Sequence, residues 1–167
     1  MLKSVEIKDL DANLFRDLHD KWMLITAGSG EVCNTMTAGW GGLGFLWGMP
    51  VTYSFVRPQR YTHDFLDREE YFTLAFFGEE YRPQLGLCGQ KSGRDVDKVK
   101  ECGFTVKTAA CGAPYFEEAE TVVVCRKRYV QAIDPALMDK ELEEKWYPTH
   151  DGYHDMYIGE IVEILKK

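Results

Sequence analysis

The feature that most constrains the fold is a series of short apolar segments rich in β-branched and aromatic residues. Segments of this composition are typical of β-strands. Six strands are expected, over residues 23–27, 34–39, 51–56, 71–77, 120–133 and 157–165. Because strands and long helices do not alternate along the chain, the pattern disfavours a doubly wound parallel sheet. It predicts a mainly β protein, an antiparallel barrel with short inserted helices.

The stretches between these strands include short helices. Apolar spacing and capping residues predict helices over residues 11–22, 62–67, 82–88 and 95–102. Asp11, Thr62 and Asp95 are expected to cap three of them, and Gly103 to end the last. No internal repeat or linker-like stretch is present, so residues 1–167 are interpreted as one domain.

The charge of the chain limits its classes of partner. A net charge of −7 leaves no basic surface for nucleic acid or an anionic membrane. No apolar run approaches the ~20 residues that span a bilayer, and the charged N-terminal segment does not resemble a secretion signal. Five widely spaced cysteines without a CxxC pair favour reduced thiols. We therefore expect a cytoplasmic protein without nucleic-acid or membrane partners.

Three segments have the composition of a ligand site. Residues 34–41, NTMTAGWG, combine small residues, hydroxyls and an aromatic ring, which suits a strand that lies close to a planar ligand. Residues 57–62, RPQRYT, place two arginines before a predicted helix, a combination that suits a phosphate. Residues 88–98, CGQKSGRDVDK, lead small and basic residues into another helix without the spacing of a Walker loop. Taken singly, each is also compatible with a kinked strand, a solvated loop or a capped turn.

The residues that could bind a metal or perform acid–base chemistry are sparse. His150 and His154 have a spacing that suits metal ligands on a helix, but Pro148 and Gly152 disfavour a helix there. No third ligand is evident, so no metal site is expected. No Ser-His-Asp or Cys-His arrangement is recognisable, so no catalytic residue is assigned. Cys33 and Cys88 would be reactive only if neighbouring groups lowered their pKa.

In this order and spacing, the segments resemble the flavin reductase-like family, the FMN-binding split barrel. The resemblance rests on NTMTAGW at residues 34–40, VRPQRYT at 56–62, CGQKSGRDVDK at 88–98 and MYIGEIV at 156–162. It implies an antiparallel Greek-key barrel that forms a homodimer, with FMN sites near the subunit interface. The residues that it assigns to FMN binding are Asn34, Thr35, Met36, Thr37, Ala38, Trp40, Arg57, Arg60, Tyr61, Thr62, Cys88, Gly89, Ser92, Gly93 and Lys98.

The resemblance also divides these residues by role. It places the strand from Thr35 to Ala38 and Trp40 beside the isoalloxazine ring, largely through backbone and hydroxyl groups. It assigns residues 57–62 to the ribityl chain and phosphate, and residues 88–98 to the rest of the pocket. Arg94 and Asp95 are expected to hold the loop and cap the helix.

The implied function is that of an FMN-dependent oxidoreductase that reduces flavin or another acceptor with NAD(P)H. No segment marks a nicotinamide site, and the bulky stretch GWGGLGFLW at residues 39–47 narrows the face that a nicotinamide would need. The alternative is therefore a flavoredoxin-like electron carrier that exchanges electrons with a redox protein. The sequence leaves open whether FMN is a resident cofactor or a substrate.

Overall fold

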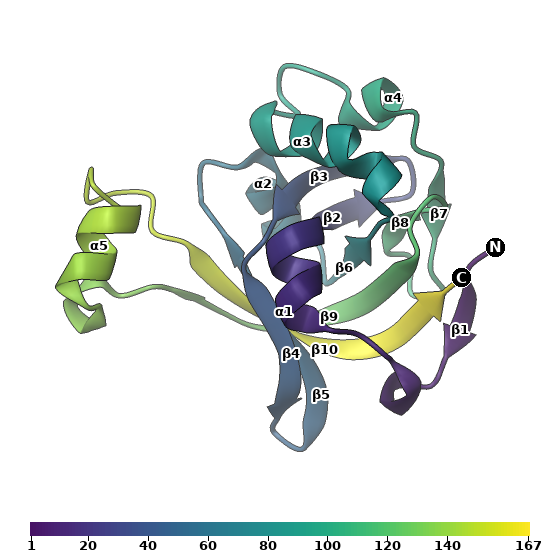
Figure 1. The fold of residues 1–167 in the computed structure, drawn as a ribbon, viewed down its shortest axis with the longest axis horizontal. Coiled ribbons are helices and arrows are strands. Elements are labelled where there is room, and N and C mark those ends of the chain that lie inside the picture. Colours follow the sequence, from purple (N-terminus) through teal and green to yellow (C-terminus); the bar gives the residue numbers. More distant parts are fainter.

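A computed structural model describes residues 1–167, and it is built around one large antiparallel sheet (Figure 1). The hydrogen-bonded strand order is β3-β2-β6-β9-β10-β5-β4, and β1 pairs with β10. The strands of this sheet are β1 (Lys3–Val5), β2 (Met23–Ser29), β3 (Val32–Ala38), β4 (Gly41–Leu46), β5 (Met49–Val56), β6 (Tyr71–Phe76), β9 (Thr121–Ala132) and β10 (Asp155–Lys166). A separate hairpin contains β7 (Val106–Thr108) and β8 (Pro114–Phe116).

Short helices occupy the connections, as expected from the sequence. They are α1 (Leu14–Arg16), α2 (Tyr61–Arg68), α3 (Arg82–Gln90), α4 (Lys98–Cys102) and α5 (Lys140–Trp146). Single 3₁₀ turns cover Ile7–Asp9, Glu79–Tyr81 and Pro135–Leu137, and a π-helical turn covers Asp17–Lys21. No helix is long and apolar enough to cross a membrane.

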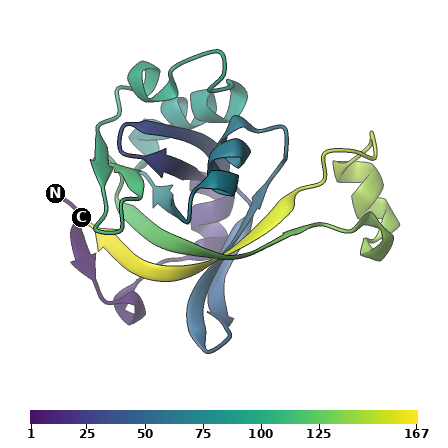
Figure 2. The ribbon, with the colours of Figure 1, turned by 180° about the vertical axis from the view of Figure 1, so that it is seen from behind.

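The sheet curls but does not close through hydrogen bonds. β3 and β4 stand at the two ends of the strand order and do not pair with each other. The expected antiparallel sheet with short helices is confirmed, whereas closure of the barrel is not seen at this seam. Figure 2 shows β9 (green) and β10 (yellow) curving side by side, with the β4–β5 hairpin (blue) extending below them. Their register shifts beside Gly159, where an added Cβ would come within 2.7 Å of the Phe72 ring, so only glycine fits at this position.

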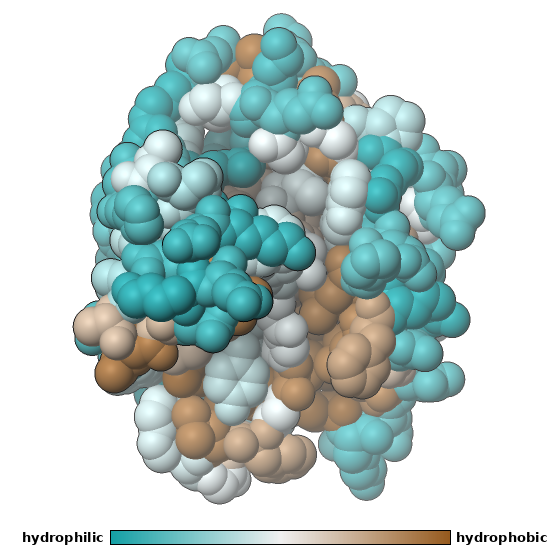
Figure 3. Space-filling view, turned by 60° about the vertical axis from the view of Figure 1, so that its left-hand side comes forward, coloured by the Kyte–Doolittle hydropathy of each residue, from teal (hydrophilic) through white to brown (hydrophobic).

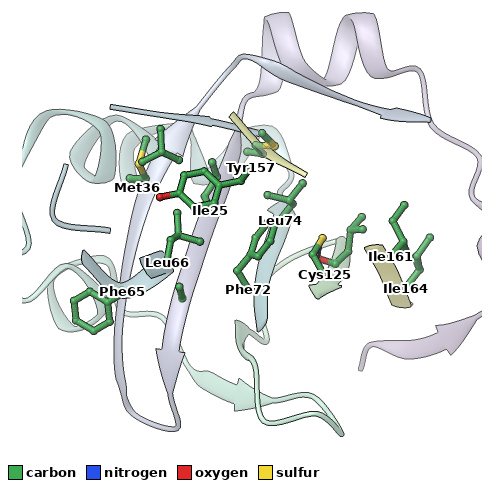
Figure 4. Close-up of a cluster of buried hydrophobic side chains, with 14 residues drawn as sticks. Ile25, Met36, Phe65, Leu66, Phe72, Leu74, Cys125, Tyr157, Ile161 and Ile164 are labelled. Carbon is green, nitrogen blue, oxygen red and sulfur yellow. Dashed lines mark hydrogen bonds between the residues drawn. The ribbon is translucent and has the colours of Figure 1, made fainter. Parts of the chain in front are cut away.

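The core lies inside the curl of the sheet. β2, β3, β6, β9 and β10 contribute alternate apolar side chains that meet Phe65 and Leu66 of α2 (Figure 4). A second apolar cluster lies on the other face of the sheet, beneath α3, α4 and the β7–β8 hairpin. β3 is thus held between α2 on one face and α3 on the other. Burial of these two clusters, rather than the weak propensity of the short helices, fixes α2 and α3 in place.

The outer ends of β9 and β10 leave the body of the protein and carry α5 at their tip (Figure 1). We call residues 130–156 the arm. Asp139 caps α5, because its side chain accepts a hydrogen bond from the Leu142 backbone N–H at 3.1 Å. Hydrogen bonds from Tyr153 and Lys140 to the buried Glu143 hold the pKa of that carboxyl at about 2. The arm is therefore internally ordered despite its small core.

Three predicted N-caps were wrong, because a different residue occupies each N-cap position. The helix near residue 11 begins only at Leu14, and Asn13 caps it instead of Asp11. Thr62 lies inside α2, because Arg60 occupies the N-cap position without a side-chain cap bond. α4 begins at Lys98, with Asp97 rather than Asp95 as its cap. The predicted end of this helix is confirmed, since Gly103 has the left-handed φ of 67°.

Candidate functional site

β3 supplies an edge around which the candidate residues gather. It pairs with β2 on one side and has no strand on the other. The polar loop from α3 to α4 crosses this open side, and α2 begins next to it. Residues of β3 line two cavities, one of about 190 Å³ and one of about 730 Å³. The sequence segments 34–40, 57–62 and 88–98 therefore meet in space.

The smaller cavity lies at the C-terminal end of β3. It is lined by Met36, Thr37, Ala38, Gly39, Trp40, Phe55, Arg57, Arg60 and His154. Six of these residues belong to the set predicted from the sequence, and Gly39 lies among them. Phe55 and His154 were missed. Aromatic walls and two guanidinium groups give this cavity the chemistry of a site for a planar ligand that carries negative charge.

Two cations, the buried Lys98 and the half-buried Arg60, converge behind this cavity. Arg60 Nη2 donates to the Cys88 carbonyl oxygen at 3.1 Å, and Lys98 Nζ donates to the same oxygen at 2.9 Å. Lys98 Nζ also donates to the Thr35 carbonyl oxygen at 2.8 Å, and the residue is only 4% exposed. No carboxylate forms an ion pair with either side chain. The protein therefore holds two neighbouring positive charges here without an acidic partner.

Burial and mutual repulsion explain the titration of these cations. Burial, followed by the charge of Arg60, lowers the pKa of Lys98 to about 8. Burial also lowers the pKa of Arg60. Both shifts mean that the protein alone does not fully compensate the charged forms. A bound anion would supply that compensation.

The larger cavity lies on the N-terminal half of β3 and is lined in part by Asn34, Thr35, Tyr61, Gly93 and Lys98. The loop approaches β3 closely here, because a Cβ on Gly93 would lie 1.9 Å from Asn34 Oδ1. Asn34 Nδ2 donates to the Thr62 hydroxyl at 2.7 Å, which ties β3 to α2. Asn34 and Thr62 thus fix the relative positions of three segments rather than facing solvent.

The threonine hydroxyls of β3 form hydrogen bonds within the protein, whereas the sequence analysis expected them to face the ligand. Thr35 Oγ1 lies 2.9 Å from Thr26 Oγ1, and Thr37 donates to the Leu85 carbonyl oxygen. The strand can therefore offer a ligand its backbone rather than these hydroxyls. Gly89 packs against Thr37, and a Cβ added at Gly89 would lie 3.4 Å from the Thr37 Cβ, in ordinary van der Waals contact.

Two further loop residues have structural contacts. Ser92 Oγ accepts a hydrogen bond from the Arg94 backbone N–H at 3.1 Å, and it lines neither cavity. Arg94 itself pairs with Asp64 at 2.6 Å and lies over the Tyr61 ring. The loop is thus tied to α2 from outside, as expected for Arg94.

The arm closes one side of the smaller cavity. Trp40 packs edge-on against Trp146 at 4.9 Å between ring centroids, and it lies 4.8 Å from the His154 ring. Arg57 Nη2 donates to the Trp146 carbonyl oxygen at 2.8 Å, and its guanidinium lies over the Tyr147 ring. Trp40 and Arg57 therefore connect the sheet to the arm.

His154 is a neutral polar group in this wall. Burial, followed by the charge of Arg57, lowers its pKa to about 4. The buried Tyr147 hydroxyl has one partner, His154 Nδ1, at 2.7 Å. A buried hydroxyl is satisfied by donating to that nitrogen, which leaves Nε2–H as the free donor of the ring. The sequence offered His154 only as a possible metal ligand, because its contacts with Tyr147 and Trp40 arise from the path of the arm and leave no signal in the sequence.

The cysteines and acidic residues show no activated nucleophile. Burial raises the pKa of Cys33 to about 11 and of Cys88 to about 12. Cys88 contributes its carbonyl oxygen to the site, while its side chain is buried on the far side. No group of three or more His, Cys, Asp or Glu side chains is arranged to bind a metal ion. The arrangement is one that binds and orients a ligand.

Comparison with known proteins identifies the family. The model of the flavin reductase like domain matches residues 15–166. No curated protein sequence matches the chain. Similar solved structures include an FMN-binding domain of a flavin reductases-like enzyme from Shewanella baltica OS155, with 16% identity and a TM-score of 0.70 over 99% of this chain and 77% of that one.

Two other similar structures carry different names. A flavoredoxin from Methanosarcina acetivorans has 19% identity and a TM-score of 0.70, over 95% of this chain and 75% of that one. An NADH:FAD oxidoreductase from Streptomyces globisporus has 15% identity and a TM-score of 0.65, over 88% and 75%. At these identities the structures show a shared fold, whereas the match to the domain model shows the family. This chain belongs to the flavin reductase like family.

Proposed function

We propose that this protein binds FMN, with the phosphate near Arg60 and Lys98 and the isoalloxazine along β3 at residues 36–40. The observation that carries the proposal is a pair of cations, the buried Lys98 and the half-buried Arg60, that share the Cys88 carbonyl oxygen and have no carboxylate partner. A phosphate dianion is the complement that such a pair lacks. Membership of a flavin reductase like family supports a flavin as the molecule that carries it.

The surrounding residues fit the rest of such a ligand. The backbone of residues 36–38 and the ring of Trp40 give the small cavity a flat, partly polar wall. Arg57 and the His154 Nε2–H are donors for the polar edge of a flavin. When bound, FMN would supply hydride transfer at its N5 atom. The chain's own part is to bind the phosphate, orient the ring and place positive charge near it.

We further propose that the site is completed in a homodimer of one-domain subunits. The cavity of 190 Å³ is smaller than the ~300–1,000 Å³ of typical small-molecule pockets. Hydrophobic residues gather on the lower part of the surface in Figure 3, at the height of the β4–β5 hairpin. That hairpin exposes Phe45 by 78% and Trp47 by 56%, and Trp47 packs edge-on with Tyr129. A second copy would cover these rings and add a wall to the pocket.

The reaction that we favour is reduction of flavin or another acceptor by NAD(P)H. The alternative is an electron carrier that receives electrons from a redox protein, which the partly exposed Trp40 and the narrow cavity favour. Anaerobic addition of NADH and NADPH to the flavin-loaded protein separates the two. Bleaching of the flavin absorption by either nucleotide supports the reductase, and bleaching by dithionite alone supports the carrier.

The FMN site itself is tested by Arg60→Ala with two ligands. FMN and riboflavin differ only by the phosphate, so the variant should weaken FMN binding about 10- to 100-fold and riboflavin binding little. The matched control is Arg126→Ala, because Arg126 is an exposed arginine paired with Glu70 outside both cavities. Equal loss of affinity for both ligands would show that Arg60 does not contact the phosphate.

A further inference from the structure

Two buried cysteine thiols lie side by side beneath the candidate site. Cys88 Sγ of α3 and Cys102 Sγ of α4 are 3.7 Å apart. Cys88 is fully buried and Cys102 is 9% exposed. They are fourteen positions apart along the chain, so their proximity arises from the packing of α3 against α4.

Neither thiol is used by the proposed flavin site. Cys88 contributes only its carbonyl oxygen there, and Cys102 otherwise donates weakly to the Gln84 carbonyl oxygen at 3.7 Å. No other two cysteine thiols of the chain lie within hydrogen-bonding distance of each other. Cys125, for example, has the Thr52 hydroxyl as its neighbour at 3.4 Å.

We propose that Cys88 and Cys102 form a redox-active dithiol that converts reversibly to an intramolecular disulfide. The oxidant is a low-molecular-weight disulfide. One cysteine thiolate attacks it and releases one small thiol, and the second cysteine then displaces the other small thiol as the Cys88–Cys102 bond forms. Two protein thiols are oxidised, one small disulfide is reduced to two thiols, and the two cysteine protons end on those thiols.

The geometry requires only a small movement of one short element. A disulfide bond is ~2.05 Å long, so the two sulfur atoms must approach by about 1.7 Å. α4 has five residues, follows the loop that crosses β3 and ends at Gly103. A shift of α4 also moves Lys98, its first residue, whose Nζ holds the Cys88 and Thr35 carbonyl oxygens. Oxidation therefore acts on the same cation that we assign to the phosphate.

Burial slows the oxidation of the two thiols but does not prevent it. Burial raises the pKa of Cys88 to about 12 and also raises the pKa of Cys102. The charged groups that face the pair are Lys98, Arg60 and Glu101. Since the thiolate is the attacking species, oxidation should be slow at neutral pH and should accelerate about tenfold per pH unit up to about pH 9.

The test counts thiols in the wild-type protein. The protein is incubated with oxidised glutathione at about pH 8.5 and then denatured. Its free thiols are titrated, and its peptides are mapped without reduction. Three of the five cysteines should remain free, and a peptide containing Cys88 should be linked to one containing Cys102. Dithiothreitol should restore all five.

Two cysteine variants, and a thiol count that needs no flavin, keep this test independent of the proposed function. Cys102→Ala should abolish the linked peptide, whereas Cys125→Ala, at a fully buried position, should keep it. The thiol count needs no flavin, so a protein that fails to bind FMN can still show the disulfide. Five free thiols after prolonged oxidation, or a link that involves Cys33 or the exposed Cys111, would overturn the inference.

Discussion

Replacing Lys98 with methionine separates the role of its charge from the role of its packing. Methionine keeps a long apolar stem but removes the buried ammonium group. In the wild type the pKa of Lys98 falls from 10.5 to about 8. At ~1.4 kcal/mol per pKa unit, the charged form therefore costs about 3–4 kcal/mol at pH 7, which the substitution relieves.

The same change removes two hydrogen bonds. The Cys88 carbonyl oxygen keeps its bond from Arg60, whereas the Thr35 carbonyl oxygen loses the donor that Lys98 provides. A buried acceptor without a partner costs about 1–3 kcal/mol. Because the relief is somewhat larger than the loss, the free energy of unfolding at pH 7 should rise, by less than about 3 kcal/mol. Chemical denaturation measures it.

The affinity for FMN should respond much more strongly. Loss of a charge-assisted hydrogen bond of about 1.5–3 kcal/mol corresponds to a roughly 10- to 150-fold weaker FMN complex. Riboflavin binding should change less than about threefold. Titration of both flavins, followed by fluorescence, provides the comparison. An equal loss for FMN and riboflavin, or unchanged FMN affinity, would refute the assignment of Lys98 to the phosphate.

The pH dependence gives a second readout on the same variant. The pKa of folded Lys98 lies below its unfolded value, so the native state binds fewer protons between about pH 8 and 10.5. Wild-type stability should therefore gain a contribution as pH rises through this window, and Lys98→Met should lack it. FMN affinity should fall above about pH 8 in the wild type, because the neutral amine no longer attracts the phosphate. A flat wild-type profile would contradict this reasoning.

Three further predictions concern other parts of the site. Gly93→Ala should lower stability by about 1–3 kcal/mol, since the new Cβ would collide with the anchored Asn34, whereas Gly86→Ala, with open space in α3, should be neutral or stabilising on denaturation. Because the pKa of His154 is lowered in the folded protein, the native state binds fewer protons than the unfolded state between about pH 6.5 and 4, and wild-type stability falls as the pH drops through this window. His154→Gln should remove this part of the loss in acid denaturation, which is about 1–2 kcal/mol after discounting for solvent screening. Trp47→Asp should yield monomers in sedimentation experiments, and an unchanged dimer would place the interface elsewhere.

The strands of the fold were predictable because their composition is unambiguous. The apolar runs that became β5, β6, β9 and β10 are rich in β-branched or aromatic residues, so local pattern and buried position agree. Three strands escaped because three residues are too few for a periodic signal: β7, β8 and the N-terminal β1. The six-residue β4 escaped because its glycine-rich sequence, GGLGFL, lacks the composition of a strand. α5 escaped although Asp139 caps it, because seven mostly charged residues show little apolar periodicity.

The site was predictable as a set of segments but not as a set of contacts. The composition of residues 34–40 and 57–62 indicated a ligand site, and these segments do meet at β3. The sequence could not reveal that the hydroxyls of Thr35 and Thr37 form hydrogen bonds within the protein. Nor could it place His154 beside Trp40, because that contact depends on the path of the arm. Such long-range contacts leave no local periodic signal.

The most direct test of the account is flavin binding by the purified protein. The protein is incubated with FMN, separated from free ligand by gel filtration, and its absorption spectrum is recorded beside that of Arg60→Ala treated in the same way. We expect the wild type to retain FMN and the variant to lose it during the separation. A wild-type protein that elutes without flavin, even after incubation with excess FMN, would contradict the central claim.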